Sequence, residues 1–510
     1  PTGGLVSSRH YFPSTAWHEF VYNRPMRTML ILMDSLNRHY LGSYGDPRVK
    51  TPNLDRFAER GVIFDNHWSG SLPCMPARRE IMTGRLNFLE TPWGPIEAWD
   101  TTVPQVLREQ SGVHSHLITD HYHYFHRGGD GYHDQFDSWE FERGQEGDKW
   151  RPVVDTPSAP EGTRGKGVGR GAYWRNRAMM DPEDDLSYPT PRCFQHAIDF
   201  VELNRDADNW HLHLEVFDPH EPFDSPQKYR DLYGDEWDRY LYNWPEYDRL
   251  DPELDDSEAV QHVRRRYAAT LTMADAWLGR LLDKIDELDM WKDTTVILTT
   301  DHGHLLGEHG FWAKNYMYDY AELAHIPMFV WAPHVKAARR SALTTTIDLA
   351  PTILDLHDAT PDPRTRGKSL LHLLGSDEVH HDWVLYGYFG KDVNMTDGRV
   401  TYTRQPLAGS VTHLHTGDLR NIRTSGERMR SAEAGHFLAN ADGVPHFRIA
   451  VPSHKHRDAP ERNLAYDLES DPAQERPIDD PAREAELAAT MKELLARHDA
   501  PASQYERLGL

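Results

Sequence analysis

The chain has 510 residues, too many for one small core, and predicts at least two domains. A hydrophobic content of 38% and an aromatic content of 11% are typical of a globular protein. The formal net charge of −24, from 56 basic and 80 acidic residues, argues against a nucleic-acid or anionic membrane partner. A local cluster of a metal ion, Arg and Lys can still bind an anionic substrate.

The only two cysteines, Cys74 and Cys193, cannot form a disulfide framework, which favours a reducing compartment. No apolar run is long enough to span a bilayer. The first residues, Pro-Thr-Gly-Gly-Leu, do not resemble a signal peptide. We therefore expect a cytoplasmic protein; a periplasmic or secreted one is the alternative if a signal peptide was removed.

Four short apolar runs predict buried strands, and each is followed by acids or histidines. Because parallel strands present their carboxyl ends at one edge of a sheet, these polar residues predict a shared site there. The alternative is that they belong to separate surface loops. The runs are Met29–Met33 before Asp34, Val113–Ile118 before Thr119-Asp-His-Tyr-His123, Leu212–Phe217 before Asp218-Pro-His220, and Thr295–Thr300 before Asp301-His302.

Helical patterns alternate with these strands, the clearest at Tyr267–Leu288. This alternation predicts an α/β fold with a large, mostly parallel sheet between helices. After about residue 380, short strand patterns and an amphipathic helix at Ala482–Arg497 predict a smaller antiparallel sheet plus helix. We divide the chain into a catalytic domain, 1–380, and a C-terminal α+β subdomain, 381–510.

Two insertions interrupt the catalytic domain. Residues 140–192 are rich in Gly, Pro and charge, typical of a rim or an oligomer contact. Residues 224–262 are acidic and aromatic, and fit either a wall that selects the substrate or a packed insertion.

The segment Cys74-Met-Pro-Ala-Arg78 places a thiol before a predicted helix that ends near Gly84. The positive end of the helix dipole and Arg78, one turn along, would stabilise a nucleophile and attract an anion. The alternative is an ordinary buried cysteine.

Other residue types complete a plausible site. Asp34, Asp301 and His302 suit a divalent metal, with Ca²⁺, Mg²⁺, Mn²⁺ and Zn²⁺ all open. Lys314 can hold an anionic oxygen, and His220 can act as general acid or base near neutral pH. Taken singly, each has a simpler interpretation, such as a turn residue or a surface charge.

Together these segments resemble the formylglycine-dependent sulfatase family of the alkaline phosphatase superfamily. Cys74-x-Pro-x-Arg78 resembles its formylglycine signature, with Ala77 where serine is commoner. The resemblance spans about residues 27–475. The other matching segments are Thr51–Gly61, Met82–Arg85, Asp301-His302 with Leu306–Gly310, Asp348–Thr352, and Tyr466–Pro472.

The resemblance implies an alkaline phosphatase-like fold and hydrolysis of a small-molecule or saccharide sulfate ester, with an oligomer possible. A formylglycine-generating enzyme would convert Cys74 to formylglycine. One hydroxyl of its hydrate would attack sulfur, and the other would lose its proton so that the aldehyde re-forms and sulfate leaves. Asp34, Cys74, Asp301 and His302 would hold one metal ion, Ca²⁺ first among the candidates. Arg78 and Lys314 would neutralise the sulfate oxygens, and His220 would protonate the leaving alcohol.

Two departures keep alternatives open. The pair Asp34-Ser35 stands where many sulfatases have two aspartates, a pattern shared with phosphonate monoester and phosphodiester hydrolases of the superfamily. The family's Gly-Lys-Trp-His segment is replaced by Thr119–His123; an ungapped alignment puts Asp120 at the lysine position, and a one-residue shift puts His121 and His123 at the substrate-binding positions. We favour the shift. A non-catalytic anion-binding protein with unmodified Cys74 is a third hypothesis.

Overall fold

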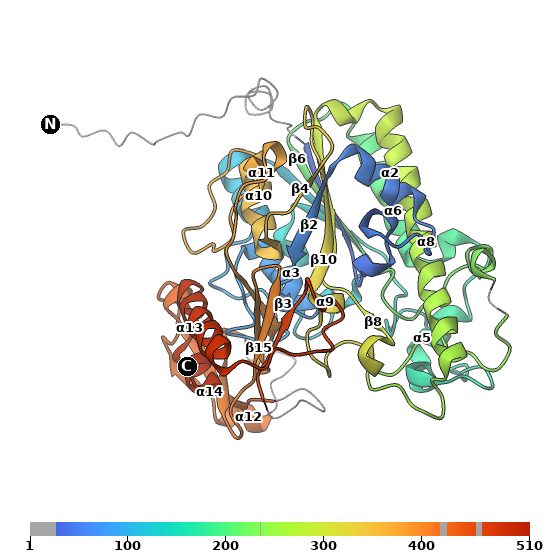
Figure 1. The fold of residues 1–510 in the computed structure, drawn as a ribbon. Helices are drawn as coiled ribbons and strands as arrows, with labels where there is room; N and C mark the ends of the chain where they lie inside the picture. Colours follow the sequence, from blue (N-terminus) through green and yellow to red (C-terminus); the bar gives the residue numbers. More distant parts are fainter. Residues whose placement is uncertain (1–26, 235, 419–425, 455–461) are drawn as a thin grey trace.

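The computed structural model describes residues 27–234, 236–418, 426–454 and 462–510 (Figure 1). The amino-terminal segment interpreted above for a signal peptide lies outside these residues. Among the described residues, no helix has both the length and the apolar character needed to cross a bilayer.

A mostly parallel sheet forms the centre of the fold, as predicted. Its described strands follow the order β11-β2-β10-β7-β1-β6-β4-β5, with β12 paired to β2. Only β10 runs against its neighbours in this described sheet. The strands are β1 (Arg27–Met33), β2 (Val62–Trp68), β4 (His114–Thr119), β5 (Ser138–Phe141), β6 (Trp210–Val216), β7 (Thr294–Thr299), β10 (His325–Trp331), β11 (Ala338–Arg340) and β12 (Thr344–Thr345).

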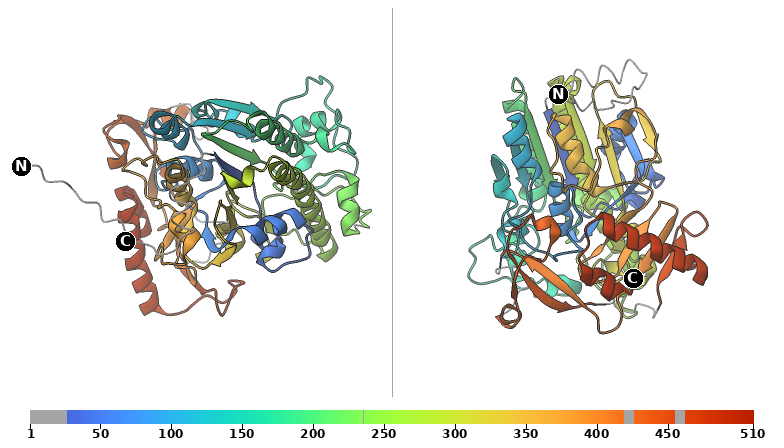
Figure 2. Two further views of the ribbon diagram at one scale, coloured as in Figure 1. Left: turned by 90° about the horizontal axis from the view of Figure 1, so that it is seen from above. Right: turned by 90° about the vertical axis from the view of Figure 1, so that its left-hand side faces the viewer.

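Helices cover both faces of this sheet (Figure 2). Alternate residues of β1 point to opposite faces: Ile31 packs with α2, α6 and α8, whereas Leu32 packs with α3, α4, α10 and α11. Burial on both sides explains why β1 is apolar throughout. The helices are α2 (Pro52–Arg60), α3 (Cys74–Thr83), α4 (Val103–Val106), α6 (Pro189–Leu203), α8 (Ser257–Glu287), α10 (Leu349–Leu356) and α11 (Leu371–Gly375).

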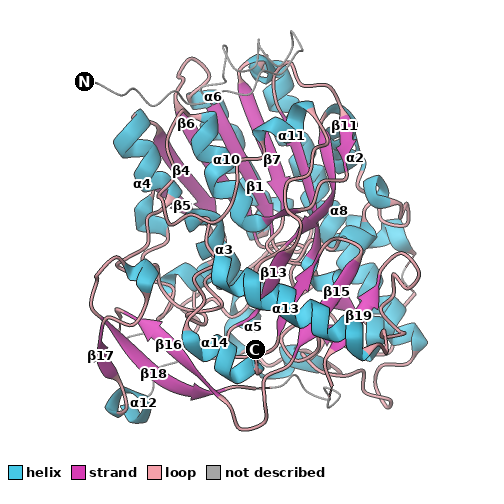
Figure 3. Cartoon of the chain, turned by 60° about the vertical axis from the view of Figure 1, so that its left-hand side comes forward, coloured by secondary structure: helices cyan, strands magenta, loops and turns pink. Residues whose placement is uncertain are grey.

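The C-terminal part contains two small sheets beyond one end of the main sheet (Figure 3). One has the order β19-β15-β14-β13-β3, and its strand β3 (Ser71–Leu72) comes from the segment just before Cys74. The C-terminal sheet is therefore hydrogen-bonded to the segment that immediately precedes Cys74, the predicted nucleophile. The remaining elements here are β13 (Val384–Tyr388), β14 (Val393–Thr396), β15 (Val400–Arg404), β16 (Val411–Thr416), β17 (Glu433–Gly435), β18 (His446–Pro452), β19 (Leu464–Asp467), α12 (Gly426–Arg430), α13 (Pro481–Arg497) and α14 (Ala502–Leu508).

The predicted strands and helices appear with small shifts at their ends. The largest difference is α8, which begins at Ser257, ten residues before the predicted Tyr267, where Asp256 caps its first turn. The insertions carry α5 (Gly171–Arg177) and α7 (Gln227–Arg230), and β8 (Leu305–Leu306), β9 (Trp312–Ala313) and α9 (Ala321–Ala324) follow β7. The boundary near residue 380 stays a prediction.

Candidate active site

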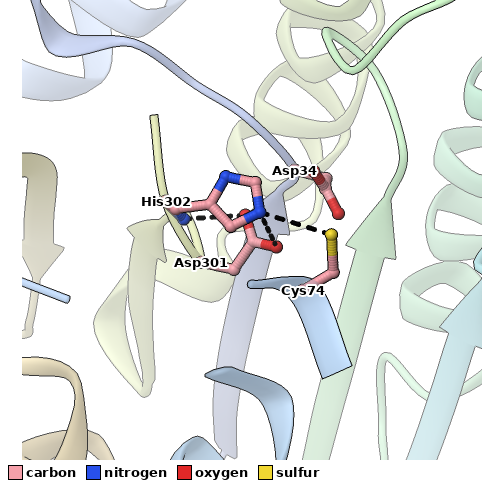
Figure 4. Close-up of side chains that lie close together, drawn as sticks. All are labelled: Asp34, Cys74, Asp301 and His302. Carbon is pink, nitrogen blue, oxygen red and sulfur yellow. Dashed lines mark hydrogen bonds and ion pairs between the residues drawn. The ribbon is translucent and has the colours of Figure 1, made fainter. Parts of the chain in front are cut away.

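Two acids and a histidine that follow two neighbouring strands meet at the start of α3. Asp34 follows β1, and Asp301 and His302 follow β7, the neighbouring parallel strand. One ligand atom from each of these residues and the sulfur of Cys74 lie within 4.8 Å of one another (Figure 4). All four side chains are buried. Two carboxylates, one imidazole and one further donor suit a divalent ion.

The tautomer of His302 fits a metal ligand. Its Nδ1 lies 2.8 Å from the carbonyl oxygen of Gly303, which can only accept, so Nδ1 carries the proton. The lone pair of Nε2 then faces Cys74 and Asp301, 3.3 Å from each. Burial lowers the pKa of His302 to about 4, so the ring is neutral at pH 7. A backbone carbonyl that orients the far nitrogen is typical of metal-bound histidine.

Cys74 is the first residue of α3, and Gly84, with φ 67°, ends the helix. The helix therefore begins at the cysteine itself rather than just after it. Burial, with Asp34 and Asp301 nearby, raises the pKa of the Cys74 thiol well above its usual value. An unmodified Cys74 is thus a protonated thiol, and helix position alone does not make it a thiolate.

Arg78 binds carboxylates inside the protein. Its Nη2 donates to Asp34 at 2.9 Å and its Nη1 to Asp301 at 2.5 Å, while Nε donates to Glu215. The side chain is 1% exposed. Arg78 therefore offsets the charge of the predicted metal ligands. Its predicted contact with sulfate oxygens stays a prediction.

Lys314 lies beside Ser35, the residue that departs from the family pattern. Its Nζ donates to Ser35 Oγ at 3.2 Å and lies 4.0 Å from Asp34 Oδ1. Ser35 has φ 63°, a strained conformation for a residue other than glycine, and its Oγ donates to Asp34 at 2.8 Å. Although burial lowers the pKa of Lys314, Cys74, Asp34 and Glu221 raise it overall. Lys314 is thus a buried cation with N–H groups to offer an oxyanion.

His220 is held by the residue that follows it. Its Nδ1 lies 2.6 Å from the carbonyl oxygen of Glu221 and 3.3 Å from the Glu221 carboxylate. Nδ1 must carry a proton, which leaves Nε2 to exchange a proton with a ligand. Burial raises the pKa of Glu221, but His220, His304 and Lys166 together lower it below its ordinary value. This carboxylate therefore stays charged beside the His220 ring.

In the Thr119–His123 segment, the residues that the two alignments place at the substrate-binding positions have different surroundings. Asp120 points into the fold, where it accepts hydrogen bonds from Phe217 N at 2.7 Å and Gln145 Nε2 at 2.9 Å. His121 and His123 face each other, with their Nδ1 atoms 3.3 Å apart. Burial lowers the pKa of both; the next cause is Arg78 for His121 and His126 for His123. Their contact with substrate stays a prediction.

The two insertions meet at Glu221. Tyr247 donates a hydrogen bond to the Glu221 carboxylate, and Lys166 lies 3.6 Å from the same group and 3.5 Å from the Tyr247 ring. Tyr242 and Trp244 are buried, so much of the aromatic insertion is packing. Part of the aromatic insertion is therefore packing, and its role in selecting the substrate stays a prediction.

A cavity of about 310 Å³ opens beside the start of α3. Its walls include the two residues before Cys74, and C-terminal residues complete them. Its lining includes Leu72, Pro73, Trp93, Tyr316, Tyr388 and Phe389. An aromatic-lined cavity of this kind is suited to a ring-shaped ligand.

The sulfatase family model matches residues 27–359. The chain belongs to the sulfatase family. Human iduronate 2-sulfatase is 27% identical over 347 residues, covering 60% of each chain. The arylsulfatase of Clostridium perfringens is 25% identical over 408 residues, covering 72% of this chain and 82% of the relative. The chain thus spans about 60% of the length of the iduronate 2-sulfatases it matches.

Solved structures share the fold of this chain. A protein in complex with its substrate D-glucosamine-2-N,6-O-disulfate superposes with a TM-score of 0.64 at 16% identity, covering 93% of this chain and 98% of that one. The phosphonate monoester hydrolase of Agrobacterium radiobacter gives 0.66 at 18% identity, covering 93% and 96%. The alkaline phosphatase-like fold predicted from the sequence is confirmed.

Two buried carboxylates of this site, Glu215 and Glu221, were absent from the sequence prediction. Glu215 ends the Arg78 network and accepts the Tyr124 hydroxyl at 2.7 Å. Glu221 orients His220. The only available signal was position: Glu215 lies near the end of a predicted strand, and Glu221 directly follows His220.

Proposed function

We propose that the protein hydrolyses sulfate monoesters in a metal-dependent reaction, through a formylglycine hydrate derived from Cys74, and releases inorganic sulfate and an alcohol. The observation that carries this proposal is the buried group of Asp34, Cys74, Asp301 and His302 with Lys314 beside it. Family membership supports the same reaction.

Asp34, Asp301, His302 and the modified Cys74 would hold one divalent ion, for which Ca²⁺ is the first candidate and Mn²⁺, Mg²⁺ and Zn²⁺ the others. When bound, the ion supplies Lewis-acid chemistry, which lowers the pKa of a hydroxyl and offsets negative charge. The donor set fits it, because both carboxylates and the free nitrogen of His302 converge.

The chain's own residues supply the other functions. Lys314 offers N–H groups to a non-bridging sulfate oxygen, where negative charge must be offset. One hydroxyl of the hydrate at position 74 gives up its proton, and its oxygen forms a new bond to sulfur. His220 gives the proton of Nε2 to the leaving alcohol as the ester S–O bond breaks. The second hydroxyl at position 74 then loses its proton and its C–O bond becomes the aldehyde carbonyl. The C–O bond to the sulfated oxygen breaks at the same time, and inorganic sulfate leaves with the electron pair. Residue 74 is thereby regenerated without hydrolysis of a stable ester.

The cavity beside α3 indicates which alcohols fit. Aromatic walls such as Trp93 and Tyr388 suit the faces of a sugar or an aryl ring. Among the chains with this fold, one binds a sulfated glucosamine. We therefore infer a small-molecule or saccharide sulfate ester as substrate.

Mass spectrometry of the peptide that contains Cys74 tests the maturation step directly. Protein from a host with a formylglycine-generating enzyme is expected to carry an aldehyde or its hydrate at residue 74. A host without that enzyme gives the matched control, with a thiol and no sulfate release. A thiol in protein from both hosts would contradict the proposal.

Phosphonate monoester or phosphodiester hydrolysis is the second candidate, and Ser35 is the observation that favours it. Its hydroxyl contributes no charge, so the site has one negative charge fewer than a pair of aspartates would give. Matched aryl sulfate and aryl phosphonate esters with one leaving group distinguish the two. Higher kcat/KM for the sulfate supports the first function, and the reverse order supports the second.

A further inference from the structure

A second group of metal-binding side chains surrounds Asp348, outside the site described above. Asp348 lies at the junction of a 3-10 helix (Thr346–Asp348) and α10, and its carboxylate is fully buried. Nε2 of His381 lies 3.0 Å from both carboxylate oxygens, and Nε2 of His380 lies 3.3 Å from Oδ2. The three ligand atoms lie within 4.8 Å of one another.

Asp348 also caps the backbone. Its oxygens accept hydrogen bonds from Thr345 N at 2.9 Å and Lys368 N at 2.8 Å. A carboxylate has about four lone-pair positions, so these two bonds leave positions free for a cation. The backbone bonds fix the carboxylate in place, as the partners of metal-bound carboxylates do.

His380 provides the second observation. Its side chain is 1% exposed, and its Nε2 is buried without a hydrogen-bond partner among the described residues. A buried nitrogen that makes no hydrogen bond destabilises the fold. Because it points at the Asp348 carboxylate beside a second imidazole, a cation between the three groups would satisfy all of them.

The distances fit a tetrahedral ion. With Zn–N bonds of about 2.0–2.1 Å, neighbouring ligands lie about 3.3–3.4 Å apart. The observed separations of 3.0 and 3.3 Å are close to this spacing. Two imidazoles and one carboxylate are ligands that Zn²⁺ accepts. The His381 side chain is 11% exposed, which gives the ion a path to the site.

We propose that Asp348, His380 and His381 form a structural zinc site. It ties the start of α10 to the loop between α11 and β13. The site lies at the opposite end of α3 from Cys74, because Lys368 N binds Asp348 and the adjacent Gly367 N binds Gly84 O at 3.1 Å. Ten helical residues separate the two ends by about 15 Å, so this ion is distinct from the catalytic one.

The test measures zinc bound by protein whose first site is saturated with Ca²⁺. Full-length protein is dialysed against Zn²⁺ in excess Ca²⁺ and analysed for both metals. We expect about one Zn²⁺ per chain in the wild type, a loss of that equivalent in the His380→Gln/His381→Gln double variant, and no loss in the control His413→Gln in β16. Wild type without bound Zn²⁺, or equal Zn²⁺ in the double variant, overturns the proposal.

A second measurement keeps the proposal testable if the double variant does not fold. The single variant His381→Gln changes the partly exposed ligand and keeps the buried His380. Its Zn²⁺ affinity is expected to fall at least tenfold, and Co²⁺ added to the Ca²⁺-saturated wild type is expected to give the visible absorption of a tetrahedral site. Unchanged affinity in His381→Gln, or an octahedral Co²⁺ spectrum in wild type, overturns the proposal. Neither readout depends on maturation of Cys74 or on sulfate release.

Discussion

Backbone carbonyls decide which ring nitrogen carries the proton in His302 and in His220. Nδ1 of His302 donates to Gly303 O, and Nδ1 of His220 donates to Glu221 O. The Nε2 atoms are thereby left to face ligands, as electron-pair donor in His302 and as proton carrier in His220. We predict different functions for the two histidines because their surroundings differ. His302 Nε2 faces the predicted metal ligands, whereas His220 has the Glu221 carboxylate beside Nδ1.

Replacing His220 with Gln tests its role as general acid. Sulfate esters of weakly acidic alcohols need a proton on the leaving oxygen, so their kcat is expected to fall by about 10²–10⁴-fold. For esters of acidic phenols, whose anions leave without protonation, kcat is expected to fall much less. These esters serve as the matched control. Equal losses for both ester classes would contradict protonation by His220.

Asp120 is expected to make stability depend on pH. Burial raises the pKa of its carboxyl group from 3.8 to about 7. Between these values the folded protein keeps a proton that the unfolded chain releases, so the free energy of unfolding falls as pH rises from about 4 to 7. The contribution is fully present below pH 4 and is lost above pH 7.

The variant Asp120→Asn removes this titration. Its free energy of unfolding relative to wild type is expected to rise from pH 4 to pH 7, by at most about 4 kcal/mol. Urea unfolding of both proteins at several pH values measures the difference. A difference that stays constant across this range would show that Asp120 does not titrate as inferred.

At the scale of elements, the two insertions converge on one carboxylate. Lys166, from the first, and Tyr247, from the second, both contact Glu221. Since Glu221 also holds His220, the insertions reach the predicted acid through a single intermediate residue. They are therefore part of the support of the site as well as packing.

Replacing Tyr247 with Phe removes the hydroxyl that donates to Glu221. We expect kcat/KM to fall about tenfold, since a hydrogen bond to a charged group contributes about 1.5 kcal/mol. The control is Tyr240→Phe in the same insertion, whose hydroxyl donates to Leu254 O. Similar losses in both variants would indicate a general effect on the insertion.

At the scale of the whole molecule, buried charged side chains lie together at the carboxyl ends of the main-sheet strands. Asp34, Asp301 and Glu215 face two buried cations, Arg78 and Lys314. The burial of so many charges is costly unless they are compensated, and a divalent ion adds the missing positive charge. Catalytic metal binding is therefore expected to stabilise the entire fold.

Removal of the metal with a calcium-selective chelator is expected to lower Tm by about 2–5 °C and to abolish sulfate release. Added Ca²⁺ is expected to restore both, and added Mn²⁺ and Mg²⁺ compare the other candidates. Differential scanning calorimetry and a sulfate assay on the same samples measure the two effects. An unchanged Tm and activity after verified metal removal would contradict a required ion.

The local sequence was sufficient to predict where the residues of short motifs lie in the fold. Cys74 and Arg78 share one helix, and Asp34 and Asp301-His302 each follow an apolar strand. Because parallel strands present their carboxyl ends at one edge, their meeting was predictable. The fold class followed from the same alternation of strands and helices.

Only the tertiary structure decided which buried charges became partners. Arg78 and Glu215 are 137 residues apart, and they meet because Glu215 lies on β6, which neighbours β1. Asp348 and His381 are 33 residues apart and meet through a loop. Spacing along the chain does not encode these pairs, since burial and strand order determine which distant groups must neutralise each other.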